Sequence, residues 1–377
     1  MTLNNETMTG PTWCQKCLSM STRHRIIFDD RGWCNACVWA ETKQTLDWTA
    51  RAQELELLLD THRRTDGGIE CLIPVSGGKD GSYVAHNLKH TYGIHVITVT
   101  IAPPLPLELG QENLAAFQAS GYNHITLNPN PRGMMKLNKV GLIEMGMPYY
   151  GWNTSILAAI VRLSSQLDIS LVFYTENGDV EYGGQQELAV NPIYDQNYMK
   201  RIYLEQGYDR MMDMANLSPE EAYFFQFPDE VTTRKSRTKF VHWSYFESWD
   251  PYRNYLVAKE HCGLTENTNS NVGTFTNFSQ NDQALYHLHC YLMYLKFGFG
   301  RANQDACIEI RRGAMTRDQG INLVRLYDGQ YPEDFVELYC DYFEMTKNEL
   351  TAVFDRWVNK ALFKKEAKLW RPQFIIK

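Results

Sequence analysis

Short apolar runs alternate with helical periodicity between residues 70 and 175, and this alternation restricts the fold more than any other feature of the chain. The runs at 70–76, 95–102, 124–127 and 170–175 have the composition of buried strands, and helical periodicity covers 80–91, 108–120 and 153–167. Strands that are joined by helices form a parallel sheet with right-handed crossovers. The pattern therefore predicts a doubly wound α/β domain.

The rest of the chain divides around this domain. We expect a cysteine-rich zinc ribbon at 1–42, a linker helix at 43–66 within a helical segment at 41–64, the α/β domain at 67–190 and a mostly helical substrate or partner domain at 191–377. Clear strands are not apparent after about residue 185, and helices are predicted at 197–214, 281–298 and 347–368. The predicted architecture is thus an α/β core with one small module before it and a helical region after it.

Two Cys-x-x-Cys pairs lie close to the N-terminus. Cys14 and Cys17 form one pair, Cys34 and Cys37 form the other, and the 16 residues between the pairs are long enough to fold back as a hairpin. Four thiolates at this spacing can enclose Zn²⁺ in a tetrahedron and leave no open position, so we expect a structural zinc ion. The alternatives are two redox motifs or unpaired thiols.

A glycine-rich loop stands directly between the first strand and its helix. It consists of Ser76, Gly77, Gly78, Lys79, Asp80, Gly81 and Ser82. Glycines let backbone N–H groups approach phosphate oxygens, and the helix N-terminus favours negative charge. Lys79 adds positive charge, and Asp80 can hold Mg²⁺ or cap the helix. The spacing differs from a Walker A motif. The alternative is a glycine-rich turn that binds nothing.

The segment SGGKDGS resembles the PP-loop of ATP pyrophosphatases, commonly written SGGxDS. The resemblance implies that ATP binds to this loop and is split between its α and β phosphates, with AMP going to a substrate oxygen. It assigns catalytic roles to Lys79 and Asp80. Gly81 departs from the pattern, where serine is usual, and Ser82 can supply the hydroxyl from the next position.

More of the chain resembles the N-acetyl sugar amidotransferases of bacterial surface-polysaccharide biosynthesis. The motifs are the cysteine pairs, the PP-loop, TENG at 175–178, EYGG at 181–184, KFGFGRA at 296–302 and MTRDQG at 315–320. The resemblance implies conversion of the acetamido group of a nucleotide-linked sugar into an acetamidino group, through an adenylated imidate, in lipopolysaccharide O-antigen or a related glycan. Glu176 follows the fourth strand, where ligands bind in doubly wound folds, and can orient Mg²⁺ or accept a proton. Its alternative role is to cap the following loop.

Further residues are candidates for binding the substrate. They are Asn177, Glu181, Tyr182, Arg234, Lys235, Arg237, His242, Lys296 and Arg301. The basic run at 232–239 can hold phosphates or a uronate carboxylate, although a solvated loop explains it equally well. His242 can stack on a sugar or base, but a histidine satisfied within the core is the default. Lys296 and Arg301 flank a glycine-rich stretch, which also suits a helix C-terminus.

Charge and composition restrict partners and location. Lys and Arg total 37 against 44 Asp and Glu, which argues against nucleic acid as a partner. The sequence contains neither an apolar run of the roughly 18 residues needed to span a membrane nor a signal-peptide pattern, so a cytoplasmic protein is expected. No glutaminase nucleophile motif is present. A separate glutaminase is therefore expected, and the resemblance implies one like imidazole glycerol phosphate synthase, with a barrel subunit that conducts ammonia.

Two other functions remain open at this point. A tRNA thiolase can also join a zinc ribbon to a PP-loop, but such enzymes often need paired cysteines in the catalytic domain, and 67–190 contains only Cys71. A non-catalytic zinc scaffold that has kept a nucleotide pocket is the second alternative. The retention of Lys79, Asp80 and Glu176 argues against it.

Overall fold

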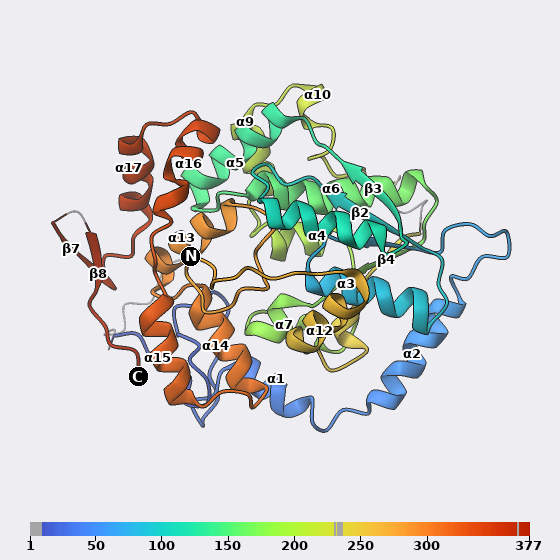
Figure 1. Cartoon of the computed structure of the whole chain (residues 1–377), viewed down its shortest axis with the longest axis horizontal. Coiled ribbons are helices and arrows are strands. Elements are labelled where there is room, and N and C mark those ends of the chain that lie inside the picture. The colour runs from blue at the N-terminus through green and yellow to red at the C-terminus, as the bar shows by residue number, and fades with distance from the viewer. Residues whose placement is uncertain (1–9, 230, 232–236, 368) are drawn as a thin grey trace.

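A six-stranded sheet forms the centre of the computed structural model, which describes residues 10–229, 231, 237–367 and 369–377 (Figure 1). The strands are β1 (Cys71–Pro74), β2 (Val96–Ile101), β3 (Asn123–Leu127), β4 (Leu171–Tyr174), β5 (Ile193–Tyr194) and β6 (Lys239–His242). Their order is β3-β2-β1-β4-β6-β5, and every neighbouring pair is parallel except β5 with β6. The α/β architecture and the largely parallel sheet agree with the sequence prediction.

Helices cover both faces of this sheet. They are α2 (Trp48–Asp60), α3 (Lys79–His86), α4 (Glu108–Ala119), α5 (Pro131–Met145) and α6 (Tyr150–Gln166), and a π-helical turn, η1 (Asn87–Thr91), continues α3. Because successive side chains of a strand point to opposite faces, β1 contributes to two cores. Leu72 packs into the core beneath α5 and α6, whereas Cys71 and Ile73 pack into the core beneath α2 and α3.

The linker and the helical segments differ from their predicted bounds. The helix expected over 41–64 is two helices, α1 (Asn35–Thr42) and α2, because the Asp47 side chain accepts a hydrogen bond from Ala50 N and starts a new helix. Helix α5 was not predicted at all. It contains Gly141, and a Cβ added there would lie 2.3 Å from the Tyr150 Cβ. The close packing of α5 on α6 therefore requires glycine at this position. Glycine has a low helix propensity, so it weakens the helical pattern in the sequence.

The sheet does not end at residue 190, where the sequence analysis places a domain boundary. Strands β5 and β6 lie beyond it, and β6 pairs with β4 along four residues. The strand is only Lys239–His242, too short for its period to stand out from the surrounding sequence. The short elements described between β4 and β6 are α7 (Gly178–Tyr182), η2 (Glu187–Ala189), α8 (Gln196–Tyr198), η3 (Met199–Tyr203), α9 (Tyr208–Ala215) and α10 (Pro219–Ala222), and η4 (Trp243–Tyr245) follows β6. The helix expected over 197–214 is therefore also interrupted.

The C-terminal part is mostly helical and packs around its own core. Its elements are α12 (Pro251–Cys262), α13 (Leu285–Phe297), α14 (Arg301–Arg311), α15 (Arg317–Tyr327), η5 (Glu333–Phe335), α16 (Val336–Phe343) and α17 (Lys347–Trp357). A hairpin of β7 (Phe363–Glu366) and β8 (Leu369–Pro372) replaces the end of the helix expected over 347–368. Among the helices that the structure describes, none combines the length and apolar character needed to cross a bilayer.

The cysteine module, which contains Cys14, Cys17, Cys34 and Cys37, packs against the C-terminal helices. These helices come from the other end of the chain. In Figure 1 the module lies beside α14 and α15, and the side chains of Leu18, Ala306 and Val324 share one core with the four cysteines. The amide of Asn303 on α14 donates a hydrogen bond to Leu18 O at 3.0 Å. The two ends of the chain therefore meet next to the α/β domain.

Candidate functional site

A cavity of about 400 Å³ opens at the carboxyl ends of the central strands. Its walls come from the loop after β1, the segment after β4, the cysteine module, α14 and the 276–282 segment before α13. Strands β1 and β4 are neighbours in the sheet, although β2 and β3 follow β1 in the chain. This reversal of strand order is the place where ligands bind in doubly wound folds.

The loop Ser76–Asp80 lines this cavity, and its shape depends on glycine. Gly77 has φ of +79°, and an added Cβ would lie 2.5 Å from Leu114 N on α4. Gly78 is the N-cap residue of α3. Because the backbone of 77 adopts a left-handed conformation against another backbone segment, only glycine is tolerated there. The loop thus presents a helix N-terminus to the cavity, a favourable setting for an anion.

Lys79 and Asp80 form an ion pair at the start of α3. The amide of Asn254 donates a hydrogen bond to Asp80 Oδ1 at 3.0 Å. Asn254 is fully buried on α12, which packs against α3. This asparagine orients the predicted catalytic carboxylate, and the sequence analysis did not identify it because it lies 174 residues away.

Glu176 lies beside Asp80 at the end of β4. The Thr175 hydroxyl donates to Glu176 Oε2 at 2.7 Å, and the Tyr182 hydroxyl donates to Oε1 at 3.2 Å. Burial and the negative charge of Asp80 raise the pKa of Glu176, and Lys79 opposes this shift. Two adjacent carboxylates in one cavity are a donor set that suits Mg²⁺, which prefers oxygen ligands.

Gly81 and Ser82 differ in their placement. Gly81 lines the cavity, and an added Cβ there would lie 3.1 Å from Pro74 O. Ser82 is fully buried, is absent from the cavity wall, and its hydroxyl has no hydrogen-bond partner among the described residues. This part of the loop therefore offers the cavity no hydroxyl, and a phosphate contact from Ser82 stays a prediction.

Of the predicted substrate residues, Tyr182 and Arg301 line the cavity, and several others do not. Asn177 caps α7 by accepting from Asp179 N and Val180 N. Glu181 accepts hydrogen bonds from Trp39 Nε1 at 2.8 Å and from Lys43 Nζ at 2.7 Å, which ties α7 to the cysteine module.

Lys296 and residues 237–239, the described end of the basic run, also lie outside the cavity wall. Lys296 Nζ donates to Met145 O at 2.6 Å, and burial lowers the pKa of Lys296 to about 8. Arg237 is exposed. Arg234 and Lys235 lie outside the described residues.

His242 belongs to the core at the end of β6. Its Nε2 shares a hydrogen bond with the Tyr203 hydroxyl at 2.6 Å, and its ring stacks on Tyr194 with centroids 4.3 Å apart. Nδ1 is buried and finds no partner within the described chain. This placement matches the default alternative of the sequence analysis rather than a ligand-stacking role.

We expect His242→Gln to reduce the sensitivity of the fold to acid. Burial lowers the pKa of His242 to about 3, whereas a histidine in an unfolded chain has a pKa of about 6.5. As the pH falls through about 6.5, the unfolded chain takes up a proton that the folded protein does not. The free energy of unfolding should therefore fall by about 2 kcal/mol between pH 8 and pH 5 through this residue. Urea unfolding should show a decrease smaller by that amount in the variant, and equal decreases would contradict the assignment.

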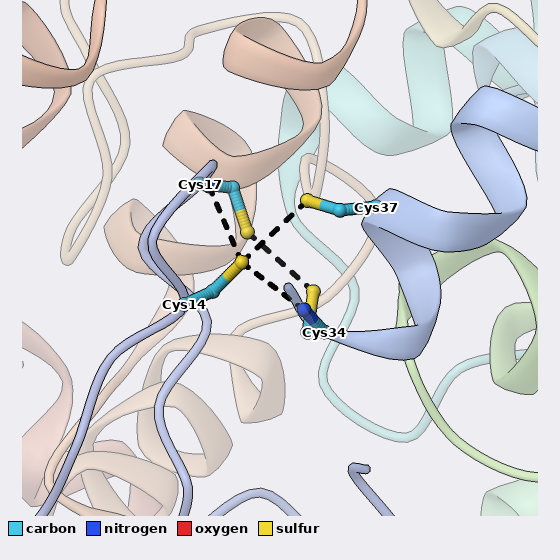
Figure 2. A group of neighbouring side chains, drawn as sticks. All are labelled: Cys14, Cys17, Cys34 and Cys37. Atoms are coloured by element: carbon cyan, nitrogen blue, oxygen red, sulfur yellow. Dashed lines mark hydrogen bonds between the residues drawn. The ribbon is translucent and has the colours of Figure 1, made fainter. Parts of the chain in front are cut away.

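The four cysteines come together as predicted (Figure 2). Their sulfur atoms lie within 4.8 Å of one another, and the Sγ atoms of Cys14 and Cys37, and of Cys17 and Cys34, are 3.7 Å apart. Sulfurs bonded to a tetrahedral zinc ion at about 2.3 Å are about 3.8 Å apart. Backbone N–H groups of Cys34 and Ser19 donate to Cys14 Sγ and Cys17 Sγ at 3.2 and 3.3 Å. The geometry and the donor set fit Zn²⁺.

The structure also brings into the cavity residues that no motif identified. Arg23, from the arm between the cysteine pairs, and Arg311, from the end of α14, both line it. Asp282 lines it as well, and burial raises the pKa of this carboxyl to about 6. Asp305 accepts from Thr274 at 2.6 Å and from Thr276 at 3.1 Å, which fixes the polar 274–276 segment to α14. No local pattern marks these residues, since each reaches the site through long-range packing.

Residues 272–375 match a family model described as LPS biosynthesis protein WbpG-like, C-terminal domain. The match spans α13 to α17 and the final hairpin, and it includes the cavity residues Arg301 and Arg311. No curated protein matches the chain. The family match supports a role in lipopolysaccharide biosynthesis.

Proposed function

We propose that the chain is an ATP-dependent amidotransferase that converts the acetamido group of a nucleotide-linked N-acetyl sugar into an acetamidino group during lipopolysaccharide O-antigen or related glycan biosynthesis. One observation carries the proposal: the loop Ser76–Asp80 and Glu176 converge in a single cavity at the reversal point of the sheet. The family match of 272–375 supports the biosynthetic setting.

The first step activates the acetamido carbonyl of the sugar, which is a poor electrophile. The amide oxygen of the substrate attacks the α-phosphorus of ATP, the bond to the β-phosphate breaks, and pyrophosphate leaves. The loop amides and Lys79 bind the departing phosphates, with the α3 N-terminus adding a favourable dipole. Mg²⁺ would neutralise phosphate charge here, with the Asp80 carboxylate as its candidate ligand. The product is an O-adenylated imidate.

The second step replaces oxygen by nitrogen. Ammonia attacks the imidate carbon, the bond from that carbon to the AMP oxygen breaks, and AMP leaves with the original carbonyl oxygen. The new nitrogen must lose a proton in this step. Glu176 is the candidate acceptor, because burial and Asp80 raise its pKa toward the range where a carboxylate is an effective base. The hydroxyls of Thr175 and Tyr182 orient it.

Ammonia is proposed to come from a separate glutaminase with a barrel subunit. All nine cysteines of the chain are buried. Outside the metal cluster, burial raises the pKa of each thiol, of Cys290 to about 12. A glutaminase nucleophile needs the opposite shift, since the thiolate is the reactive form.

Isotope transfer tests the proposal directly. With substrate labelled by ¹⁸O in the acetamido carbonyl, ATP, Mg²⁺ and ammonium at raised pH, we expect the label in AMP and a sugar product lighter than unlabelled substrate by about one mass unit, as NH replaces O. With glutamine, turnover should require the added glutaminase and barrel subunit. Label that stays in the sugar, ADP and orthophosphate as products, or sulfur transfer to tRNA would each reject the proposal.

A further inference from the structure

Two arginines from opposite ends of the chain meet on one wall of the cavity. Arg23 lies in the arm between the two cysteine pairs, and Arg311 is the last residue of α14. Both line the cavity and both are partly buried. The loop Ser76–Asp80, hereafter the phosphate loop, forms a different wall of the cavity. The wall with the two arginines is built from the cysteine module and α14.

Among the described residues, the two arginines differ from the other cations around them in lacking a carboxylate partner. Lys79 pairs with Asp80, Arg301 with Asp305 at 2.8 Å, and Arg312 with Glu309 at 2.7 Å. Across the part of the chain that the structure describes, the Arg23 guanidinium has neither a hydrogen-bond acceptor nor an ion pair, and the Arg311 side chain has one contact, from Nη1 to Cys17 Sγ at 3.8 Å.

Holding two unpaired cations together in a partly buried wall is unfavourable. Burial and the charge of Arg311 lower the pKa of Arg23. A zinc ion with four thiolates carries two negative charges and offsets part of this cost for Arg311, which contacts Cys17. Arg23 makes no such sulfur contact. A bound anion in the cavity would stabilise both guanidinium groups, which are well suited to carboxylate and phosphate oxygens.

We propose that Arg23 and Arg311 form a second anion-binding subsite, which holds an anionic group of the sugar nucleotide on the cysteine-module wall while ATP occupies the phosphate loop. This proposal rests on the proposed function and deepens it. The anion is an oxyanion of the acceptor substrate, either its diphosphate or a uronate carboxylate. The cysteine module is therefore part of the substrate site in addition to its structural role.

Calorimetric binding to the full-length, zinc-loaded protein tests the subsite. The phosphate loop is first saturated with Mg²⁺ and α,β-methylene-ATP, which cannot be cleaved between its α and β phosphates. UDP-N-acetylglucosamine and UDP-N-acetylglucosaminuronic acid are then titrated. We expect Arg23→Gln and Arg311→Gln each to weaken binding by about tenfold or more, because each removes a charge-assisted hydrogen bond. Weakening with both probes identifies the diphosphate, and weakening with the uronate alone identifies the carboxylate.

Arg31→Gln is the matched control, because Arg31 lies in the same module, pairs with Asp29 and Glu41 at the surface and does not line the cavity. It should bind both probes as the wild type does. Failure of the wild type to bind either probe, affinities within twofold in both cavity variants, or loss of zinc from both would overturn the subsite. Arginine-dependent binding without amidine formation would instead leave the subsite intact and reject the proposed function.

Discussion

Asp80→Asn is expected to lower pyrophosphate release on the order of a thousandfold, equal to about 4 kcal/mol of transition-state stabilisation. The carboxylate pairs with Lys79 and interacts electrostatically with Glu176. In the proposed mechanism its charge organises Mg²⁺ around the phosphates. Asparagine keeps the shape and can still accept from Asn254 through its oxygen. Thermal unfolding should therefore change little, which separates catalytic loss from misfolding.

Asp341→Asn is a suitable control for this result, because Asp341 is exposed on α16 and does not line the cavity. It should release pyrophosphate at the wild-type rate. A rate within tenfold of wild type in Asp80→Asn would place the metal and the phosphates elsewhere. The phosphate-loop assignment would then have to be abandoned.

Cys34→Ser is expected to reduce bound zinc from about one equivalent per chain to a small fraction and to cost about 3 kcal/mol or more of stability. The free energy of zinc binding contributes to folding, since the four ligands come together only in the folded module. Cys34 is also the N-cap residue of α1, which packs against α7, the helix whose Tyr182 donates a hydrogen bond to Glu176. Loss of zinc should therefore disturb the cavity as well as the module.

Cys340→Ser measures the cost of the same substitution at a buried thiol outside the cluster, because Cys340 packs in the C-terminal core. It should keep a full equivalent of zinc and lose less stability. Metal analysis of both variants, combined with chemical unfolding, makes the comparison. Equal zinc contents in the two variants would show that the four-cysteine cluster does not hold the metal.

Asp80→Asn and Cys34→Ser probe two different walls of one cavity. Asp80 belongs to the phosphate-loop wall, and Cys34 supports the module that supplies Arg23 to the other wall. If both predictions hold, Asp80→Asn should still bind the sugar nucleotide but release pyrophosphate much more slowly. Cys34→Ser should lose sugar-nucleotide binding together with zinc. This contrast links the metal centre to substrate binding.

Much of the fold follows from patterns that span a few residues. The alternation of strands and helices predicted β1 to β4 and three of the helices around them, because a buried strand and an amphipathic helix each have a local period. Helix α5 was not predicted, because close contact with Tyr150 requires glycine at position 141 and this glycine weakens the helical pattern. Strand β6 was not predicted, because four residues are too few to establish a strand period.

The candidate site divides in the same way. Ser76–Asp80 and Glu176 were identifiable because each follows a strand, and the carboxyl ends of parallel strands share an edge of the sheet. His242 also ends a strand, yet its ring packs against Tyr194 in the core. The position after a strand therefore identifies candidate site residues. Packing in the folded protein decides which of these side chains line the cavity.

The α/β alternation, the glycine-rich turn and the four-cysteine cluster are all visible in the sequence alone. These features depend on residues that are neighbours in the chain, where periodicity, φ requirements and ligand spacing are visible. Only the tertiary structure decided that Asn254 holds Asp80, that β6 completes the sheet, and that Arg23 meets Arg311. Such contacts join segments that lie tens to hundreds of residues apart in the chain. They form because packing of whole elements outweighs the entropy of closing long loops, a balance that no local pattern encodes.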